Sequence, residues 1–363
     1  MGGEMRIDHF VLADFVARIF EAAACDEAES ARVGLSLVGA NLAGHDSHGV
    51  IRVPRYIAWL ESGVLQRGQT ITIVSEGPAH ASLHGNSGFG QTIGPLAVDF
   101  GLAKARAAGV AVVGLRNAGH LGRIGEWGER AAEAGMVAIH FVNVANGAIV
   151  APFGGVERMF ATNPVCIAVP SADGPPIVLD FATSLVAEGK AQVAAAGGKP
   201  LPPGALVGPD GRLSADPALL YGPLDTPGVR EPGRGPGALR PFGEHKGSGL
   251  AFMCEILAAC LTGGATSAPV DRRPGRRVSN GMLSIYLDPA HFAGAGFAAA
   301  VAGYAGLVAA SRPAVPGGTV LLPGEAERRT CEQRMREGVP LQADTWERIT
   351  AVARRLGVPL PAA

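Results

Sequence analysis

The chain lacks the glycine patterns by which the commonest nucleotide-binding folds are recognised. No Gly-x-Gly-x-x-Gly follows an expected strand anywhere in its 363 residues, and no Gly-x-x-x-x-Gly-Lys-Ser/Thr occurs. The first absence argues against a standard Rossmann site, and the second argues against a P-loop.

The sequence also lacks an excess of charge and any close pair of cysteines. Its formal net charge is −1, which argues against nucleic acid or an anionic membrane surface as a partner. Arg272, Arg273, Arg276 and Arg277 form a short basic run broken by Pro274, which we interpret as a solvated loop. The five cysteines are odd in number and contain no Cys-x-x-Cys, which favours a reducing, cytoplasmic compartment over a disulfide framework.

No apolar run has the length of a membrane span. The most apolar stretch, from Gly249 to Leu261, is short and contains Glu255, so we expect a core helix there. The first six residues lack the apolar segment of a signal peptide, and Arg6 spoils a myristoylation pattern. We therefore expect neither export nor membrane insertion.

Helical periodicity dominates the start of the sequence, and strand and helix patterns alternate after it. Helices are expected over 10–20, after an Asp26/Glu29 capping box, over 56–61, 94–107, 125–134, 184–196, 247–261 and 290–310, and twice more before the C-terminus. Strands are expected over 70–74, 79–83, 110–115, 137–144, 165–169, 177–179, 282–287 and 320–322. The Pro/Gly-rich stretch at about 197–241 is expected to form turns and surface connections. The pattern predicts an α/β protein.

The segment 41–56 holds the densest group of reactive side chains: Asn-Leu-Ala-Gly-His-Asp-Ser-His-Gly-Val-Ile-Arg-Val-Pro-Arg-Tyr. His48 can give or take a proton near neutral pH. Arg52 lies four residues later and would share a helical face with it. A 2-oxo acid needs such a proton donor beside a carboxylate-binding group. The alternative is a turn between two helices, in which Asp46 or Ser47 is an N-cap and the histidines are solvated.

Three further segments place polar groups where a strand meets a helix. Residues 117–125 end a strand in glycines, so backbone N–H groups and a helix dipole could bind an anion there. Lys246 falls at the start of the apolar helix, where either a bound anion or Glu244 would offset its charge. Asp180 ends a strand before a hydroxyl-rich helix start, a position that suits either a ligand or a cap.

Two other chemistries remain as alternatives. A metal could be held by a set drawn from His45, Asp46, His48, His120 and His245, although no His-x-x-x-His or His-Glu-x-x-His spacing occurs. Ser47 and His48 could form a nucleophile pair. Adjacent residues rarely face each other, however, and the chain has no Gly-x-Ser-x-Gly elbow.

Seven short motifs occur in the order Gly-His-Asp-Ser-His-Gly, Asn-Ala-Gly-His-Leu-Gly-Arg-Ile-Gly, Ala-Pro-Phe-Gly-Gly, Ala-Thr-Asn-Pro, Leu-Asp-Phe-Ala-Thr-Ser, Glu-His-Lys-Gly-Ser-Gly-Leu and Leu-Pro-Gly-Glu. Their order and spacing resemble the type-2 malate/L-lactate dehydrogenase family from about residue 8 to residue 358. Ala-Asn-Leu-Ala-Gly-His-Asp-Ser-His-Gly and Met-Cys-Glu-Ile-Leu are most similar to its hydroxycarboxylate dehydrogenase B branch.

The resemblance implies a non-Rossmann nicotinamide-binding domain over 71–324, with a mixed, largely antiparallel sheet. It also implies a helical domain built from 1–70 and 325–363, and a homodimer. The implied reaction interconverts an L-2-hydroxy acid and its 2-oxo acid by hydride transfer with NAD or NADP and without metal. Alternatives are an imino-acid reductase or a ureidoglycolate-type dehydrogenase of the same family, a metal-assisted hydrolase or lyase, or a sensor that binds the dinucleotide without turnover.

The resemblance also implies roles for individual residues. His48 would donate the proton, with Ser47 and Asp180 tuning it, Arg52 would bind the substrate carboxylate, and Thr162 would lie near the substrate. The residues around the dinucleotide would be His120, Leu121, Gly122, Asp180, Phe181, Ala182, Thr183, His245, Lys246, Gly247, Pro323, Gly324 and Glu325. The chain departs from the family pattern in a longer glycine-rich loop at 228–240 and at Gly119 and Ala161. The last two are near the implied site, which puts the substrate preference, but not hydride transfer, in question.

Overall fold

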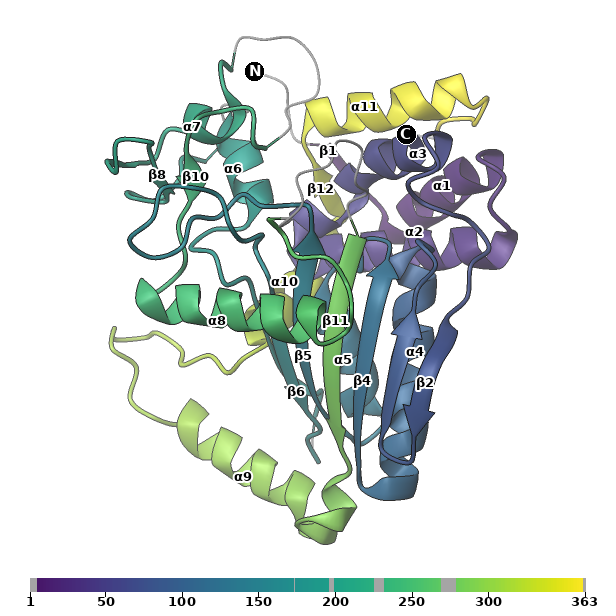
Figure 1. The fold of residues 1–363 in the computed structure, drawn as a ribbon, viewed down its shortest axis with the longest axis vertical. Coiled ribbons are helices and arrows are strands. Elements are labelled where there is room, and N and C mark those ends of the chain that lie inside the picture. Colours follow the sequence, from purple (N-terminus) through teal and green to yellow (C-terminus); the bar gives the residue numbers. More distant parts are fainter. Residues whose placement is uncertain (1–4, 173, 196–198, 225–231, 269–278, 362–363) are drawn as a thin grey trace.

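A seven-stranded sheet forms the centre of the molecule (Figure 1). The computed structural model describes residues 5–172, 174–195, 199–224, 232–268 and 279–361. In spatial order the strands are β2 (Thr72–Gly77), β3 (His80–His84), β4 (Val110–Ala118), β11 (Ser279–Leu287), β5 (Val137–Ala145), β6 (Val165–Val169) and β7 (Ile177–Phe181). Only β3 and β4 pair in parallel, so the predicted mixed, largely antiparallel sheet is confirmed.

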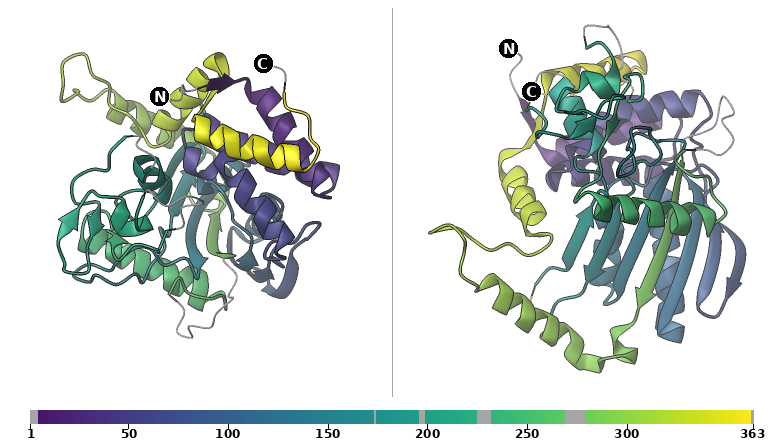
Figure 2. Two further views of the ribbon diagram at one scale, coloured as in Figure 1. Left: turned by 90° about the horizontal axis from the view of Figure 1, so that it is seen from above. Right: turned by 60° about the vertical axis from the view of Figure 1, so that its left-hand side comes forward.

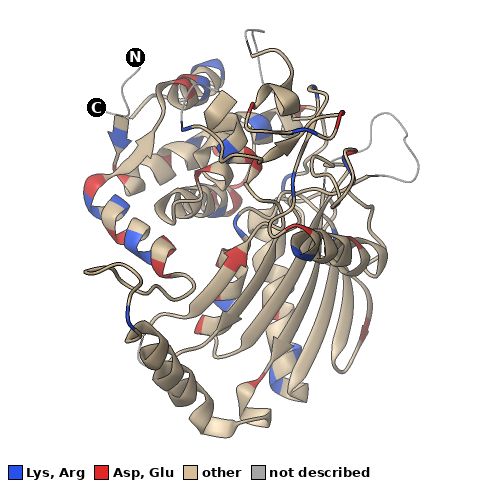
Figure 3. Cartoon of the chain, turned by 90° about the vertical axis from the view of Figure 1, so that its left-hand side faces the viewer, with Lys and Arg blue, Asp and Glu red and all other residues tan. Residues whose placement is uncertain are grey.

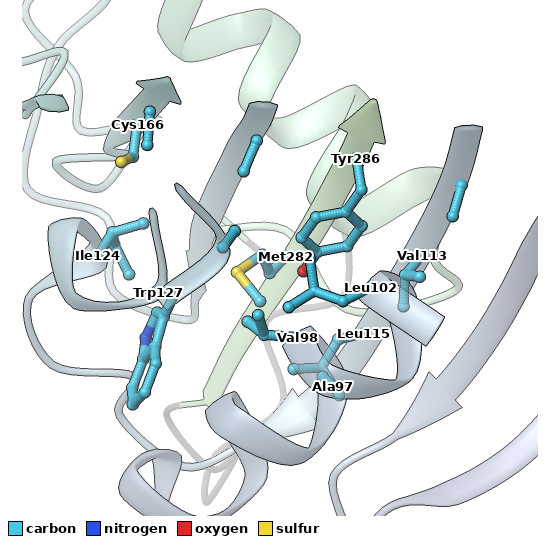
Figure 4. Close-up of a cluster of buried hydrophobic side chains, with 14 of the residues drawn as sticks. Ala97, Val98, Leu102, Val113, Leu115, Ile124, Trp127, Cys166, Met282 and Tyr286 are labelled. Atoms are coloured by element: carbon cyan, nitrogen blue, oxygen red, sulfur yellow. The ribbon is translucent and has the colours of Figure 1, made fainter. Parts of the chain in front are cut away.

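Two helices cover one face of this sheet, α4 (Gly90–Ala108) and α5 (Ile124–Glu133). Trp127 of α5 and Leu102 of α4 pack with Met282 and Tyr286 of the central strand β11 (Figure 4). All four side chains are buried, and each apolar group removed from water adds to stability at about 25 cal/mol per Å². This packing holds the ends of the strands, and the loops that follow them, in fixed positions.

A second core joins the two ends of the chain. It contains α1 (His9–Ala22), α2 (Glu27–Leu42), α3 (Val53–Glu61) and α11 (Ala343–Arg355), with α10 (Glu325–Glu337) against α2. The short strands β1 (Met5–Ile7) and β12 (Val339–Leu341) pair beside it, so the two termini lie at the same end of the molecule (Figure 2). The predicted Asp26 cap is present, since its carboxylate accepts from Glu29 N at 2.7 Å. The exact division into two domains stays a prediction.

The described parts of the Pro/Gly-rich stretch contain more regular secondary structure than the sequence predicted. They contain α7 (Ala218–Tyr221) and a three-stranded sheet of β8 (Leu206–Val207), β9 (Leu213–Ser214) and β10 (Ala238–Leu239). Together with α6 (Glu188–Ala195) these elements bury a small core of their own. The basic run at 272–277 lies outside the described residues.

Three predicted elements need correction. The helix expected over 184–196 begins only at Glu188, and the helix expected over 290–310 begins as α9 at Phe297, after two short 3-10 turns. The strand expected over 320–322 is wrong, because these residues lead into α10, where Leu322 N donates to the Glu325 carboxylate.

The apolar helix predicted over 247–261 is confirmed in outline, as α8 (His245–Glu255) continued by a π-helical turn (Ile256–Cys260). Within the described ranges, no helix combines the length and apolar character needed to cross a bilayer.

Candidate active site

A cleft of about 1490 Å³ separates the helical part from the ends of the central strands. Its walls come from the turn before α3, the loop before α5, the ends of β5 and β7, helix α6 and the first turns of α10. Pockets for drug-sized ligands span about 300–1,000 Å³, so this cleft has room for a large cofactor beside a small acid.

The turn that carries the predicted catalytic residues is held rigidly by Asn41 of α2. Its side chain accepts from Val50 N at 2.8 Å and donates to the Asp46 carboxylate at 2.6 Å. Gly49 permits this contact, because a Cβ there would lie 2.1 Å from Asn41 Oδ1. Two consecutive 3-10 turns, Asp46–His48 and Val50–Arg52, therefore precede α3 in place of a continuous helix.

Polar side chains of this turn form hydrogen bonds and ion pairs with α10. Arg334 donates to both oxygens of the Asp46 carboxylate, at 2.6 and 3.0 Å, and to the backbone carbonyl of Asn41. His45 Nε2 lies 3.5 Å from Glu327. Neither Asp46 nor Ser47 caps a helix as the alternative interpretation required, and Asp46 instead fixes the position of the turn.

His48 lies in the cleft between two partners. Its Nδ1 is 3.1 Å from Ser47 Oγ, and its ring stacks on His120 with a centroid separation of 5.5 Å and an interplanar angle of 4°. Burial, helped by the positive charge of Arg52, lowers the pKa of His48 to about 3. The imidazole is therefore neutral at pH 7 before an anionic ligand enters.

Arg52 follows on the same side of the cleft. Its Nε donates to the Ser47 carbonyl at 2.5 Å, and its Nη2 lies 3.6 Å from Glu188 of α6. Helix α6 comes this close because of Gly189, where a Cβ would lie 2.0 Å from the Ser47 Cβ. A mostly buried guanidinium held in this way is well suited to bind a carboxylate.

Asp180 lies at the end of β7, and its carboxylate contacts the backbone at the start of α5. It accepts from Gly125 N at 2.7 Å, while Asn280 Oδ1 accepts from Leu121 N at 2.8 Å. Two of the backbone donors expected to bind an external anion are thus already used inside the protein. Burial raises the pKa of the Asp180 carboxyl, and within the described residues it makes no hydrogen bond to His48. Its tuning role stays a prediction.

The cleft brings together about half of the predicted site residues. Its lining includes Ser47, His48, Arg52, His120, Gly122, Thr162, Asp180, Phe181 and Ala182. Two others are buried in the core behind this surface, namely Leu121 and Thr183. The remainder lie outside the lining, with His245, Lys246 and Gly247 at the start of α8 and Pro323, Gly324 and Glu325 before or at the start of α10. Their contact with a dinucleotide stays a prediction.

Several lining residues were not predicted from sequence. Arg55 and Trp59 follow Arg52 by three and seven residues on α3, and the helical spacing could have identified both. Arg123 lies 8% exposed at the cleft wall and pairs with Glu129. The contribution of α6, including Glu188, had no signal in the sequence, because it depends on the close approach at Gly189.

Metal ligation has no support in the geometry. Across the described ranges, no group of three or more His, Cys, Asp or Glu side chains is arranged to hold a metal ion. His45, Asp46 and His48 are instead bonded to Glu327, Arg334 and Ser47 respectively, and His245 lies against Phe153 outside the cleft.

The largely antiparallel sheet beside this cleft is not a Rossmann arrangement, and comparison with known proteins identifies the family. The chain belongs to the malate/L-lactate dehydrogenase family, whose sequence description matches residues 7–350. It is 39% identical over 357 residues to hydroxycarboxylate dehydrogenase B of Escherichia coli strain K12, covering 98% of this chain and 95% of that protein.

Other relatives are named for different activities. A Δ1-pyrroline-2-carboxylate/Δ1-piperideine-2-carboxylate reductase of Pseudomonas putida is 36% identical, with 81% of this chain and 83% of that protein covered. The structure of sulfolactate dehydrogenase from Methanocaldococcus jannaschii superposes with a TM-score of 0.84 at 30% identity, covering 98% of both chains. The predicted family is confirmed, whereas the relatives differ in substrate.

Proposed function

We propose that the protein is an NAD(P)-dependent 2-hydroxycarboxylate dehydrogenase, which interconverts an L-2-hydroxy acid and its 2-oxo acid by direct hydride transfer. The observation that carries this proposal is the fixed turn that presents His48 and Arg52 to one cleft. The names of the relatives support an acid substrate, since malate, lactate, sulfolactate and cyclic imino acids all carry a carboxylate.

The residues present fit a nicotinamide cofactor. Beside the polar turn, the cleft has apolar walls from Val142 and Val144 of β5 and from Ile124, and it continues past Phe181 at the end of β7. An apolar lining suits a nicotinamide ring, and Gly122 and Ala182, which have little or no side chain, line the same cleft. When bound, the reduced nicotinamide supplies a hydride to the carbonyl carbon of the substrate.

Side chains of the protein bind the substrate and donate the proton. Burial and, after it, the charge of Arg52 hold the pKa of His48 low, and the substrate carboxylate bound by Arg52 offsets the second of these causes. His48 then gains a proton more readily and delivers it from Nε2 to the oxygen that becomes the hydroxyl. Ser47 Oγ, bonded at Nδ1, keeps the ring in orientation.

An assay panel tests this proposal. We expect the protein to oxidise NADH or NADPH with at least one of pyruvate, oxaloacetate, phenylpyruvate, hydroxyphenylpyruvate, glyoxylate and a cyclic imino acid, with or without a chelator. The readout is the absorbance of the reduced nicotinamide. Activity lost to the chelator would favour the metal-assisted alternative. Cofactor binding without turnover on any acid would favour the sensor.

We further propose a homodimer in the cytoplasm. All five cysteines are free, which suits a reducing compartment. Helix α9 (Phe297–Ala309) has no charged residue and no buried residue, and Figure 3 shows it in tan at the edge of the molecule. The accessible surface is 16665 Å², about 3,000 Å² more than a compact monomer of this mass exposes. Burial of α9 against a second copy would remove part of this excess.

The dimer is tested by mass in solution. We expect sedimentation at twice the 37.0 kDa chain mass, and dissociation in a Tyr304→Asp/Leu307→Asp variant of α9, where these side chains are 71% and 70% exposed. Phe10→Asp is the matched control, because Phe10 on α1 is 71% exposed and should not affect the mass. A wild-type monomer at micromolar concentration would contradict the proposal.

A further inference from the structure

Glu188 of α6 has a fixed position in the cleft, beside the residue proposed to bind the substrate carboxylate. Its Oε1 accepts from the hydroxyl of Tyr221 at 2.9 Å, and the same hydroxyl lies 3.2 Å from the backbone carbonyl of Glu188. Tyr221 ends α7 and is only 4% exposed. Burial and, after it, the charge of Glu188 raise the pKa of Tyr221, so the phenol keeps its proton. A buried donor from another helix therefore holds the Glu188 carboxylate in place.

The second oxygen of this carboxylate faces Arg52. Glu188 Oε2 lies 3.6 Å from Arg52 Nη2, and both side chains are mostly buried. The Nε of Arg52 already donates to the Ser47 carbonyl. An incoming carboxylate can therefore bind this guanidinium only through Nη1 and Nη2, which form the end that faces Glu188. An acid bound there lies beside the Glu188 carboxylate.

The other carboxylates in the described part of the cleft lining each have a partner away from Arg52. They are Asp46 with Arg334, Glu327 with His45, and Asp180 with the backbone N of Gly125. Glu188 instead faces the group that the substrate is proposed to use. Its negative charge is therefore placed where it can discriminate among acids.

We propose that Glu188 is a specificity-determining residue, which disfavours a second negative group on the 2-oxo acid, with Tyr221 as its positioning residue. The inference rests on the proposed function. The end carbons of a four-carbon acid are only about 4 Å apart, so a second carboxylate cannot lie far from Arg52 and Glu188. Two negative charges this close repel each other, and burial weakens the screening by water. An uncharged group in the same position avoids this repulsion.

Cations in the same lining determine how the effect has to be measured. Arg55, Lys190 and Lys199 also line the cleft, and they attract any anionic acid. The substrate preference of the wild-type protein contains their contribution as well as that of Glu188. A variant in which only the Glu188 carboxylate is neutralised isolates its effect, because these cations stay in place. Oxaloacetate and 2-oxobutyrate suit the comparison, since they have the same length and differ in a terminal carboxylate against a methyl group.

The measured quantity is kcat/KM for oxaloacetate divided by kcat/KM for 2-oxobutyrate. We expect Glu188→Gln, which keeps the size and can still accept from Tyr221, to raise this ratio by about 10- to 100-fold. KM for 2-oxobutyrate should also fall, because Arg52 loses a competing anion. Tyr221→Phe should raise the ratio by a smaller factor, since the carboxylate is then no longer held. General damage to the fold would lower activity on both acids and leave the ratio unchanged.

Glu327→Gln is the matched control. It removes one negative charge from the same lining, but at the edge where Glu327 pairs with His45. We expect its ratio to stay within about threefold of the wild-type ratio, because the charge that it removes is not beside Arg52.

The outcomes separate this inference from the function beneath it. A ratio in Glu188→Gln within about threefold of wild type overturns the proposal, even if KM falls for both acids, since Glu188 would then only compete for Arg52. An equal rise in Glu327→Gln also overturns it, because the effect would then belong to the total charge of the cleft. A wild-type protein that reduces no acid shows that the proposed function has failed, and the specificity inference fails with it.

Discussion

Replacement of His48 by alanine is expected to lower kcat for oxo-acid reduction by about 10²- to 10⁴-fold, while binding of the reduced dinucleotide is kept. The position of this side chain is fixed both by its own turn and by a hydroxyl at Nδ1. Steady-state kinetics and fluorescence titration with the dinucleotide measure the two quantities separately.

His45→Ala is the matched control, because it removes an imidazole from the same turn and lining. We expect it to change kcat by less than about tenfold, since His45 pairs with Glu327 at the cleft edge. Equal losses in both variants would instead support a metal-binding turn. A His48→Ala enzyme within a few-fold of wild type would show that His48 is not the proton donor.

The pH dependence follows from the lowered pKa of His48. The free protein holds this ring neutral above about pH 3, whereas reduction requires the protonated form. We therefore expect kcat/KM for reduction to fall as pH rises from 5 to 8. Oxidation of the hydroxy acid requires the neutral form of His48, so kcat/KM for oxidation should not fall between pH 5 and 8. The His48→Ala variant should lose this contrast between the two directions.

Replacement of Arg52 by lysine or alanine is the second large expected effect. We expect kcat/KM for the acid to fall by about 10²- to 10³-fold, mainly through a higher KM, because the substrate carboxylate loses its charged partner. Lysine keeps the charge but lacks the planar donors that bind the Ser47 carbonyl and face Glu188. Arg52→Lys should therefore retain little more of the wild-type kcat/KM than Arg52→Ala.

Arg55 provides the comparison for this variant. It lines the cleft one helical turn further along α3, and Arg55→Lys should leave KM for the acid within about fivefold of wild type. Similar KM changes at both positions would show that no single guanidinium binds the carboxylate. Unchanged kinetics in Arg52→Ala would place the acid elsewhere in the cleft.

Local patterns in the sequence predicted those parts of the fold that local physics decides. The buried positions of α1 and the Asp26 cap on α2 follow from periodicity and from side-chain chemistry within a few residues. The strand expected at 320–322 failed because an extended apolar segment needs a neighbouring strand, and none pairs with it among the described residues. The 3-10 geometry at 46–52 likewise depends on Asn41, which lies at the end of the preceding helix.

In the candidate site, too, only residues close to one another in the sequence could be predicted to lie together. His48, Ser47 and Arg52 could be found together because they lie within six residues of one another. Glu188, Gly189 and Asn280 reach the cleft only through tertiary packing, which a single sequence does not reveal. Lys246 and Glu325 were placed near the dinucleotide by resemblance, and the structure puts them outside the cleft lining.

The bond from Arg334 to Asp46 has a consequence for how the enzyme is made. The turn bearing His48 lies near the beginning of the chain, but its clamp comes from α10, almost 290 residues later. The same core also needs β12 and α11, which follow α10. During synthesis, the central sheet can form while this turn still lacks its clamp. Catalytic competence is therefore expected only after α10, β12 and α11 have been synthesised and have folded against the turn.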